Sequence, residues 1–109
     1  MSLTVKTLNN MLDSVFSQDL FVAALTDADA SAEVLTGRKP ISFTAANIGA
    51  VLGNSDEDLV IQAGTTVTHL AIFDSLTSGD LICILELTDP ESYSNEGSMS
   101  VRDLSISLV

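Results

Sequence analysis

Apolar residues recur at every second position over long stretches of this chain, and this period of two constrains the fold more than any other feature. In segment 81–87, leucine and cysteine at odd positions alternate with isoleucine and glutamate at even positions. In segment 104–108, leucine or isoleucine alternates with serine. Because successive side chains of a β-strand point to opposite faces, both segments are predicted strands. Both faces of 81–87 are apolar in its first half, which favours a central position in a sandwich.

The rest of the chain repeats this pattern of short strands and polar turns. The other predicted strands are apolar segments bounded by polar or turn-forming residues, and they span residues 19–25, 41–44, 58–62 and 65–73. Three stretches with small polar residues are predicted loops, at residues 26–37, 45–57 and 89–97. Turn signals every ~8–12 residues are typical of all-β domains. The predicted fold class is therefore mainly β, an antiparallel β-sandwich or small barrel.

The N-terminal segment has a helical period instead. Leu8, Met11, Leu12, Val15 and Phe16 follow the spacing i, i+3, i+4, i+7 and i+8, which places them on one stripe of a helix. We therefore expect a short amphipathic α-helix over about residues 3–17, outside the β pattern.

The length of 109 residues fits one domain, because single domains cluster near ~100–150 residues. We expect a single domain over residues 1–109, with the helix followed by a β-sandwich over about 19–109. The helix could pack on its own sandwich, or it could lie on a partner and present Leu3, Val5 and Leu8. The sequence leaves both arrangements open.

The charge balance argues against two classes of partner. Four Lys and Arg residues stand against fifteen Asp and Glu residues, for a net charge of −11. Affinity for phosphate comes from clustered Lys and Arg, so we expect no nucleic-acid binding and no binding to an anionic membrane. The longest strongly apolar run is Leu81–Leu85, far short of the ~20 residues of a membrane-spanning helix. The first residues, 1–6, lack the pattern of a secretory signal, so we expect none.

Two residues are candidates for catalysis, and both have a simpler structural interpretation. His69, the only histidine, lies in a predicted strand, where we expect it to be hydrogen-bonded to a neighbouring backbone or hydroxyl group. Cys83 lies mid-strand among apolar residues, which predicts a small buried side chain rather than a reactive thiolate. A single cysteine also excludes an intrachain disulfide and a cysteine-based zinc site. We expect no enzyme activity, no catalytic or metal site and no cofactor.

Acidic residues form two groups that could bind a cation or act as an acid–base pair. Asp27, Asp29, Ser31 and Glu33 occupy alternate positions, as at the start of a calcium loop. Alanine and arginine stand where that loop needs its glycine and its final glutamate, so a solvated acidic loop is expected. The triplet 56–58 (Asp-Glu-Asp) is expected to be a hydrated turn.

Arg38 and Lys39 are the only adjacent cations, directly before Pro40. Two interpretations remain open for this pair. It could be a solvated strand start, or it could form an ion pair with an acidic loop of a neighbouring subunit.

The segment 63–74 (AGTTVTHLAIFD), followed by 77–81 (TSGDL), resembles a family of small structural proteins of tailed-bacteriophage virions. These are tail-fibre or head-decoration proteins that carry a GTTVTH segment. Other features agree in order: a short helix, a strand, a small-polar loop, an arginine at 38 and a closing strand that alternates Leu and Ile. Ile72 and Phe73 replace an aromatic-rich pair of that family, and the loop after Gly49 is short. The resemblance offers no catalytic residue.

The resemblance implies a virion protein that is assembled in the cytoplasm of the bacterial host. Our leading hypothesis is a capsid decoration or cement protein that stabilises the head lattice as a homo-oligomer, expected to be a trimer, on the major capsid protein. The alternative is a tail or fibre-associated component, either an adaptor or a receptor- or carbohydrate-binding module. In that case the three predicted loops would cluster at one end, with Tyr93 as the only candidate for stacking on a sugar.

Overall fold

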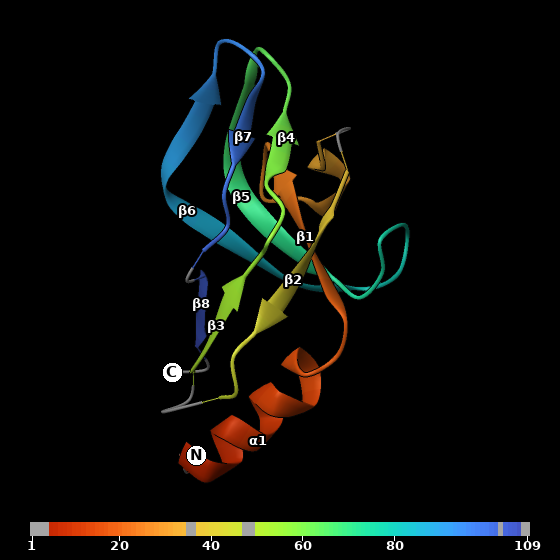
Figure 1. Cartoon of the computed structure of the whole chain (residues 1–109), viewed down its shortest axis with the longest axis vertical. Coiled ribbons are helices and arrows are strands. Elements are labelled where there is room, and N and C mark those ends of the chain that lie inside the picture. The colour runs from red at the N-terminus through yellow and green to blue at the C-terminus, as the bar shows by residue number, and fades with distance from the viewer. Residues whose placement is uncertain (1–4, 35–36, 47–49, 103, 108–109) are drawn as a thin grey trace.

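The computed structural model describes residues 5–34, 37–46, 50–102 and 104–107 (Figure 1). It begins with helix α1 (Val5–Phe16), close to the predicted helix, whose residues 3 and 4 lie outside the described ranges. The strands are β1 (Leu20–Leu25), β2 (Lys39–Phe43), β3 (Ala50–Asn54), β4 (Leu59–Ile61), β5 (Thr65–Phe73), β6 (Leu81–Tyr93), β7 (Gly97–Met99) and β8 (Leu104–Ser107). A short 3-10 turn, η1 (Ala30–Ala32), lies between β1 and β2. The predicted mainly-β class with a short N-terminal helix is confirmed.

Six strands form one antiparallel sheet in the order β6-β5-β1-β2-β3-β8, which curls into a half-barrel. The remaining two strands, β4 and β7, pair with each other as a separate ribbon. Figure 1 shows this ribbon in front of β5, and α1 below the sheet. Buried leucine, isoleucine and methionine side chains of the ribbon belong to the same apolar cluster as β1 and β5. The ribbon therefore closes part of the hollow of the half-barrel.

Strand β1 is the buried centre of the sheet, because β5 pairs on one side of it and β2 on the other. Val22 and Ala24 face the main apolar cluster, whereas Ala23 and Leu25 belong to a second cluster with Ala71 and Phe73. Burial on both faces explains why residues 20–25 are apolar almost without interruption.

Helix α1 packs on its own chain, which answers the question that the sequence left open. Its buried stripe consists of Leu8, Leu12 and Phe16, and the Phe16 ring lies 4.8 Å from the Phe43 ring, centroid to centroid. On its polar side, Asp13 Oδ1 accepts a hydrogen bond of 2.8 Å from the backbone N–H of Ala46.

Strand β6 is an edge strand, so its predicted central position is wrong. It pairs with β5, and among the described residues no strand pairs along its other side. The register runs from His69 opposite Glu86 to Val67 opposite Glu91, so residues 87–90 bulge out against a single residue of β5. Apolar residues on both faces are typical of central strands, but they do not show whether strands pair along both edges.

Two of the three predicted loops contain strands. Strand β3 lies inside the predicted loop 45–57, and β6 continues through residues 89–93 of the predicted loop 89–97. Residues 45–57 and 89–97 are therefore not loops throughout, contrary to the prediction. Short strands with glycine and acidic residues resemble turns in sequence, because pairing with a distant strand gives no local signal.

Candidate interaction surface

Arg38 is the most highly connected side chain that the structure describes, and it lies directly before β2. Its Nε and Nη2 atoms contact the two carboxylate oxygens of Glu33 at 2.9 and 3.0 Å. Its Nη1 atom donates to the backbone carbonyls of Ser75 and Ser78, at 2.7 Å each. The guanidinium carbon lies 3.6 Å from the centroid of the Phe73 ring. One cation thus joins the segment after β1 to the end of β5 and the loop that follows it.

For Arg38, these contacts rule out both interpretations of the Arg38–Lys39 pair, the solvated strand start and the ion pair with a neighbouring subunit. The Arg38 side chain is only 9% exposed, and its carboxylate partner Glu33 belongs to the same chain. It is therefore neither solvated nor available to a neighbouring subunit. The second cation, Lys39, forms only a long ion pair, with 4.0 Å between its Nζ atom and Oε1 of Glu57.

The Arg38 contacts fix the loop of residues 74–80 between β5 and β6, called here the β5–β6 loop. Asp74 and Asp80 close its base, since the N–H of Asp74 donates to the Asp80 carbonyl and the N–H of Asp80 donates to Asp74 Oδ1 at 2.7 Å. Within the loop, Ser78 and Gly79 adopt positive φ angles of 55° and 76°. Figure 1 shows that this loop projects sideways from the sheet. The loop is therefore tied to the body of the protein at its base and through Arg38.

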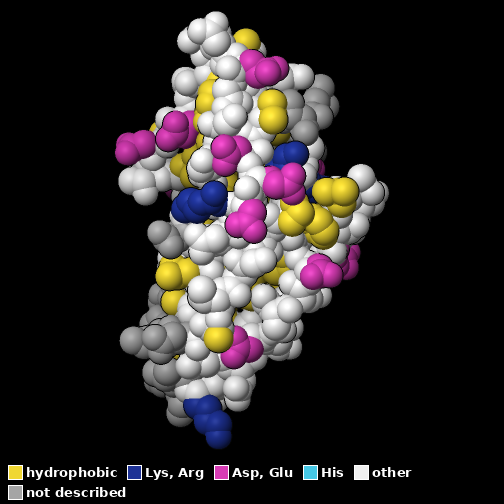
Figure 2. All heavy atoms as spheres, in the orientation of Figure 1, with side chains coloured by type: hydrophobic (Ala, Val, Ile, Leu, Met, Phe, Trp, Pro, Cys, Tyr) yellow, Lys and Arg dark blue, Asp and Glu magenta, His cyan; other side chains and the backbone are white. Residues whose placement is uncertain are grey.

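Apolar side chains are exposed on the β5–β6 loop and continue onto the start of β6. Leu76 is 53% exposed and Leu81 is 40% exposed. The next four residues, 82–85, are all half-buried and all apolar. We call Leu76 together with residues 81–85 the β6 edge surface. Figure 2 shows hydrophobic side chains on the side from which the loop projects, with acidic side chains scattered over the same face.

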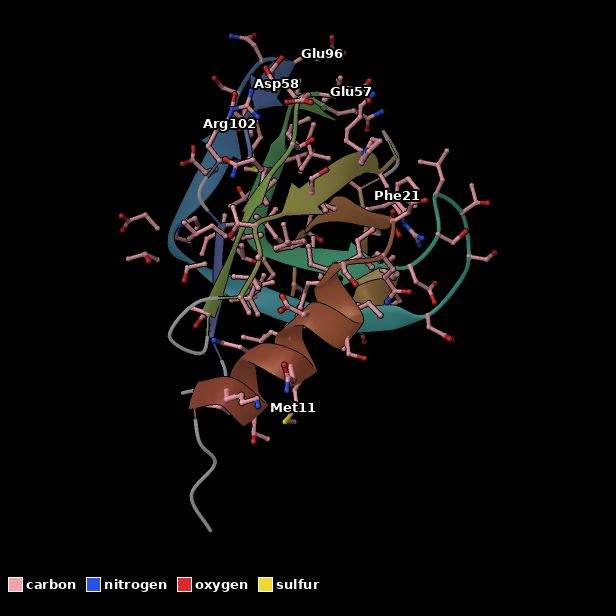
Figure 3. All side chains as sticks on the ribbon, turned by 60° about the horizontal axis from the view of Figure 1, so that its bottom comes forward. Met11, Phe21, Glu57, Asp58, Glu96 and Arg102 are labelled. Carbon is pink, nitrogen blue, oxygen red and sulfur yellow. The ribbon has the colours of Figure 1, made fainter. Side chains whose placement is uncertain are left out.

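A second exposed apolar area lies on the outer side of α1. Met11 is 47% exposed, and Figure 3 shows it on the side of the helix that is turned away from the sheets. A shallow hollow of about 540 Å³ lies beside it. Its described lining comes entirely from the helix, including Val15 and parts of Leu12 and Phe16.

A second hollow, of about 310 Å³, lies between the bulge of β6 and the segment 99–104. Its apolar lining residues are Leu70, Leu87, Met99, Val101 and Leu104, and its charged ones are Asp89, Glu91 and Arg102. This hollow marks the opening of the half-barrel, because β6 and β8 are the two edges of the curled sheet.

The two catalytic candidates lie on neighbouring strands but do not meet. His69 Nδ1 lies 2.7 Å from the hydroxyl of Thr68, a neighbouring hydroxyl group as predicted. Its Nε2 lies 3.9 Å from the exposed carboxylate of Glu86. Cys83 is opposite Ile72, three positions further along the strand pair than His69, so the two side chains point to opposite faces of the sheet.

Cys83 is half-buried rather than fully buried, because it lies on an edge strand. Burial raises the pKa of its thiol, which disfavours the thiolate form that acts as a nucleophile. The predicted small apolar role fits this environment, although its burial is only partial.

The acidic residues of 27–33 have separate local roles. Asp29 caps η1 by accepting from the N–H of Ser31 at 2.9 Å, and the backbone and side-chain hydrogen bonds from Ser31 lower the pKa of the Asp29 carboxyl. Asp27 accepts from the N–H of Ala28 at 2.7 Å, and Glu33 is bound by Arg38. Among the described residues, no three His, Cys, Asp or Glu side chains form a group suited to a metal ion.

The remaining candidates are also tied to nearby structure. Asp58 accepts a hydrogen bond of 2.9 Å from the hydroxyl of Ser100, which joins β4 to the segment after β7. Tyr93 is half-buried against the main cluster, and burial, followed by the charge of Glu91, raises the pKa of its phenol.

Sequence reasoning missed Ser55, the one polar residue that is fully buried in the part of the chain that the structure describes. Its Oγ atom lies 2.7 Å from the Pro40 carbonyl and 2.8 Å from the Glu57 carbonyl, and its single proton serves one of them at a time. Its backbone N–H donates to the carbonyl of Val101 at 2.9 Å. Its position inside an Asn-Ser-Asp-Glu turn signal gave no hint of burial.

In the described ranges, no helix has the length and apolar character required to span a membrane. No curated protein matches the sequence. Residues 7–108 match the protein family described as podophage GP4 fiber I protein gp80. The match runs from α1 to the end of β8, and it confirms that the chain is a phage structural protein and hence a component of the virion. It does not single out the GTTVTH segment as a family signature. The chain belongs to the podophage GP4 fiber I protein gp80 family.

Proposed function

We propose that this protein is a structural component of a podophage fibre, and that it acts by binding copies of itself and a tail protein rather than by catalysis. The observation that carries the proposal is the family match over residues 7–108, which includes most of helix α1 and every described strand. A fibre component must hold its shape and present surfaces to its neighbours. The Arg38 contacts and the two exposed apolar areas are consistent with both requirements.

The geometry of His69 and Cys83 supports a function without catalysis. Nucleophilic catalysis needs a nucleophile within hydrogen-bond reach of its base. Here the imidazole and the thiol point to opposite faces of the sheet, and burial disfavours the thiolate. A hydrolytic activity of the purified protein that is lost in His69→Ala would contradict this part of the proposal.

Capsid decoration, the leading hypothesis from the sequence, stays a prediction. The family description names a fibre, which favours the tail-associated alternative over the head lattice. The expected trimer also stays a prediction.

Electron cryomicroscopy of intact particles tests the proposed location. We expect a tag inserted in the exposed turn of residues 94–96, between β6 and β7, to label the fibres of the tail. Quantitative mass spectrometry should give a copy number close to that of tail proteins. A label spread over the head, with a copy number close to that of the major capsid protein, would replace the fibre proposal with decoration.

A further inference from the structure

A hollow of about 320 Å³ lies where helix α1 leads into strand β1, beside strand β2. Its lining consists of residues 16–21 and 40–43. We propose that this hollow binds a single neutral sugar ring, such as the terminal residue of a glycan. The inference goes beyond the proposed function, because a fibre component that binds its own copies and a tail protein needs no such ligand.

One part of the lining is an apolar platform on the outer face of the sheet, formed by Phe21 and Pro40. These two residues are directly opposite each other in the pairing of β1 with β2, so their side chains lie next to each other. Phe21 is half-buried and Pro40 is exposed, which leaves apolar ring surface open to an occupant. The face of an aromatic ring is electrically negative, so it attracts the weakly positive C–H groups on the flat side of a sugar.

A polar edge adjoins this platform. Asp19 directly precedes and Ser42 directly follows the opposed pair of Leu20 and Ile41, so they occupy the next position along the two strands. Because side chains alternate between the faces of a sheet, Asp19 and Ser42 share the outer face with the platform. A serine and a glutamine at positions 17 and 18 complete the polar part of the lining. The carboxylate, the amide and the hydroxyls together offer both acceptors and donors.

These polar side chains are available, and the surface beneath them is already formed. In the part of the chain that the structure describes, none of the four takes part in a hydrogen bond or an ion pair. Leu20 and Ile41 are buried in the main apolar cluster. The Phe16 ring packs against the Phe43 ring at 4.8 Å between centroids. A site whose walls are fixed before binding loses less entropy when a ligand enters.

The chemistry of the lining selects a neutral ligand with hydroxyl groups. Asp19 is the one charged residue among the described residues of the lining, and its carboxylate repels phosphates and carboxylates. A purely apolar ligand would displace water from the polar edge without replacing its hydrogen bonds. A sugar ring combines a flat apolar side with hydroxyls at its rim, so it matches both parts of the hollow. Tyr93, the stacking candidate from the sequence, lies outside this lining.

The volume of the hollow sets the size of the ligand. Small-molecule sites span roughly 300–1,000 Å³, and this hollow lies at the lower end of that range. It therefore accommodates one ring, and the rest of a longer glycan would extend into solvent.

Titration followed by nuclear magnetic resonance tests the proposal on the ¹⁵N-labelled full chain. The probes are the methyl glycosides of glucose, galactose, mannose and N-acetylglucosamine. Sorbitol, which has the hydroxyls without the ring, and methylammonium, which is a simple cation, are the control ligands. At least one glycoside should give saturable amide shifts at residues 16–21 and 40–43, and neither control ligand should do so.

Variants of the lining test the roles of its two parts. Asp19→Asn should weaken binding of that glycoside about tenfold, because a neutral acceptor replaces a charged one. Phe21→Leu should also weaken binding, since it keeps an apolar side chain but removes the ring face, whereas Phe21→Tyr should bind like the unaltered protein. Asp89→Asn, which alters an exposed carboxylate of the other hollow, is the matched control and should change nothing.

Each outcome supports or overturns the proposal. Saturable shifts at the hollow that Asp19→Asn and Phe21→Leu both weaken support it. Unchanged spectra at residues 16–21 and 40–43 with all four glycosides would overturn it. Equal binding of sorbitol would refute the stacking, and equal binding of methylammonium would make the hollow a cation site instead. Circular dichroism identifies a variant that fails to fold, and Asp19→Asn, at an exposed position outside the strands, keeps the test decisive if Phe21→Leu does. The fibre location is decided separately, on intact particles.

Discussion

Strands β1 and β6 have similar apolar sequences but opposite positions in the sheet. In β1, five of the six residues are buried, because strands pair on both sides and both faces are covered. In β6, not one of the thirteen residues reaches that degree of burial. The comparison teaches that an apolar strand in a single chain is not evidence of a central strand.

The largest expected effect compares an isoleucine on β5, the strand next to β1 in the buried centre of the sheet, with an isoleucine on β6. Ile72 on β5 is 0% exposed, whereas Ile82 on β6 is half-buried. Ile72→Ala should lower the free energy of unfolding by about 3–4 kcal/mol, because it leaves a cavity in the main cluster. Ile82→Ala should cost about 1 kcal/mol in the dilute protein, since solvent already reaches its site. Urea denaturation measures both, and equal losses would contradict the contrast between centre and edge.

The next effect concerns the cation that covers the outer face of the buried centre. Arg38→Met should cost about 3 kcal/mol, because it leaves Glu33 and two loop carbonyls without their partner. Limited proteolysis should then cut the β5–β6 loop faster than in the unaltered protein. Arg38→Lys keeps the charge but loses the forked contact with Glu33. Its stability should therefore lie between that of the unaltered protein and that of Arg38→Met. A fully stable Arg38→Met variant would show that the loop is held by other contacts.

A smaller effect is expected at the buried serine between β3 and β4. Ser55→Ala removes a hydroxyl whose partners are buried carbonyls, which should cost about 1–2 kcal/mol. The exposed Ser98 on β7 is the control, and Ser98→Ala should change stability by less than about 0.5 kcal/mol. Thermal unfolding of both variants provides the measurement. Similar values for both would mean that the Ser55 hydrogen bonds contribute no net stability.

The smallest effect concerns the thiol of the edge strand. The pKa of Cys83 is raised above the ordinary value of 9.0, so the unfolded chain loses this proton before the folded chain does. The contribution of Cys83 to stability should therefore be complete below pH 9 and decline as the pH rises toward the folded-state pKa. Measuring the free energy of unfolding of the unaltered protein and of Cys83→Ala over pH 8–10 isolates this contribution. A thiol reagent at pH 8 should react more slowly with the folded protein than with the urea-unfolded protein.

Local periodicity predicts much of this fold. The predicted helix and the predicted strand over residues 65–73 correspond closely to α1 and β5, because each depends on neighbours within a few residues. Within the predicted helix stripe, Leu8, Leu12 and Phe16 are buried, whereas Met11 is exposed. Strand β3 escapes prediction because its identity comes from pairing with β2 and β8, far away in sequence. The edge position of β6 escapes for the same reason.

In the candidate site too, features that depend on sequence neighbours could be predicted, and features that depend on distant residues could not. The type and position of His69 and Cys83 could be read from the sequence, and so could the Asp and Glu residues that bind locally. The role of Arg38 could not, because its carbonyl partners Ser75 and Ser78 lie 37 and 40 residues away. Ser55 likewise depends on Pro40 and Val101, which only the folded chain brings to it.

The shielding of Arg38 bears on how the protein responds to the salt of its surroundings. Mobile ions weaken attractions between exposed charges, with a Debye length near 8 Å at physiological ionic strength, but they reach a secluded pair poorly. Two carbonyls and an aromatic ring also hold this guanidinium, and none of them carries a net charge for ions to screen. The outline of the projecting loop should therefore be the same at low and at high salt concentration.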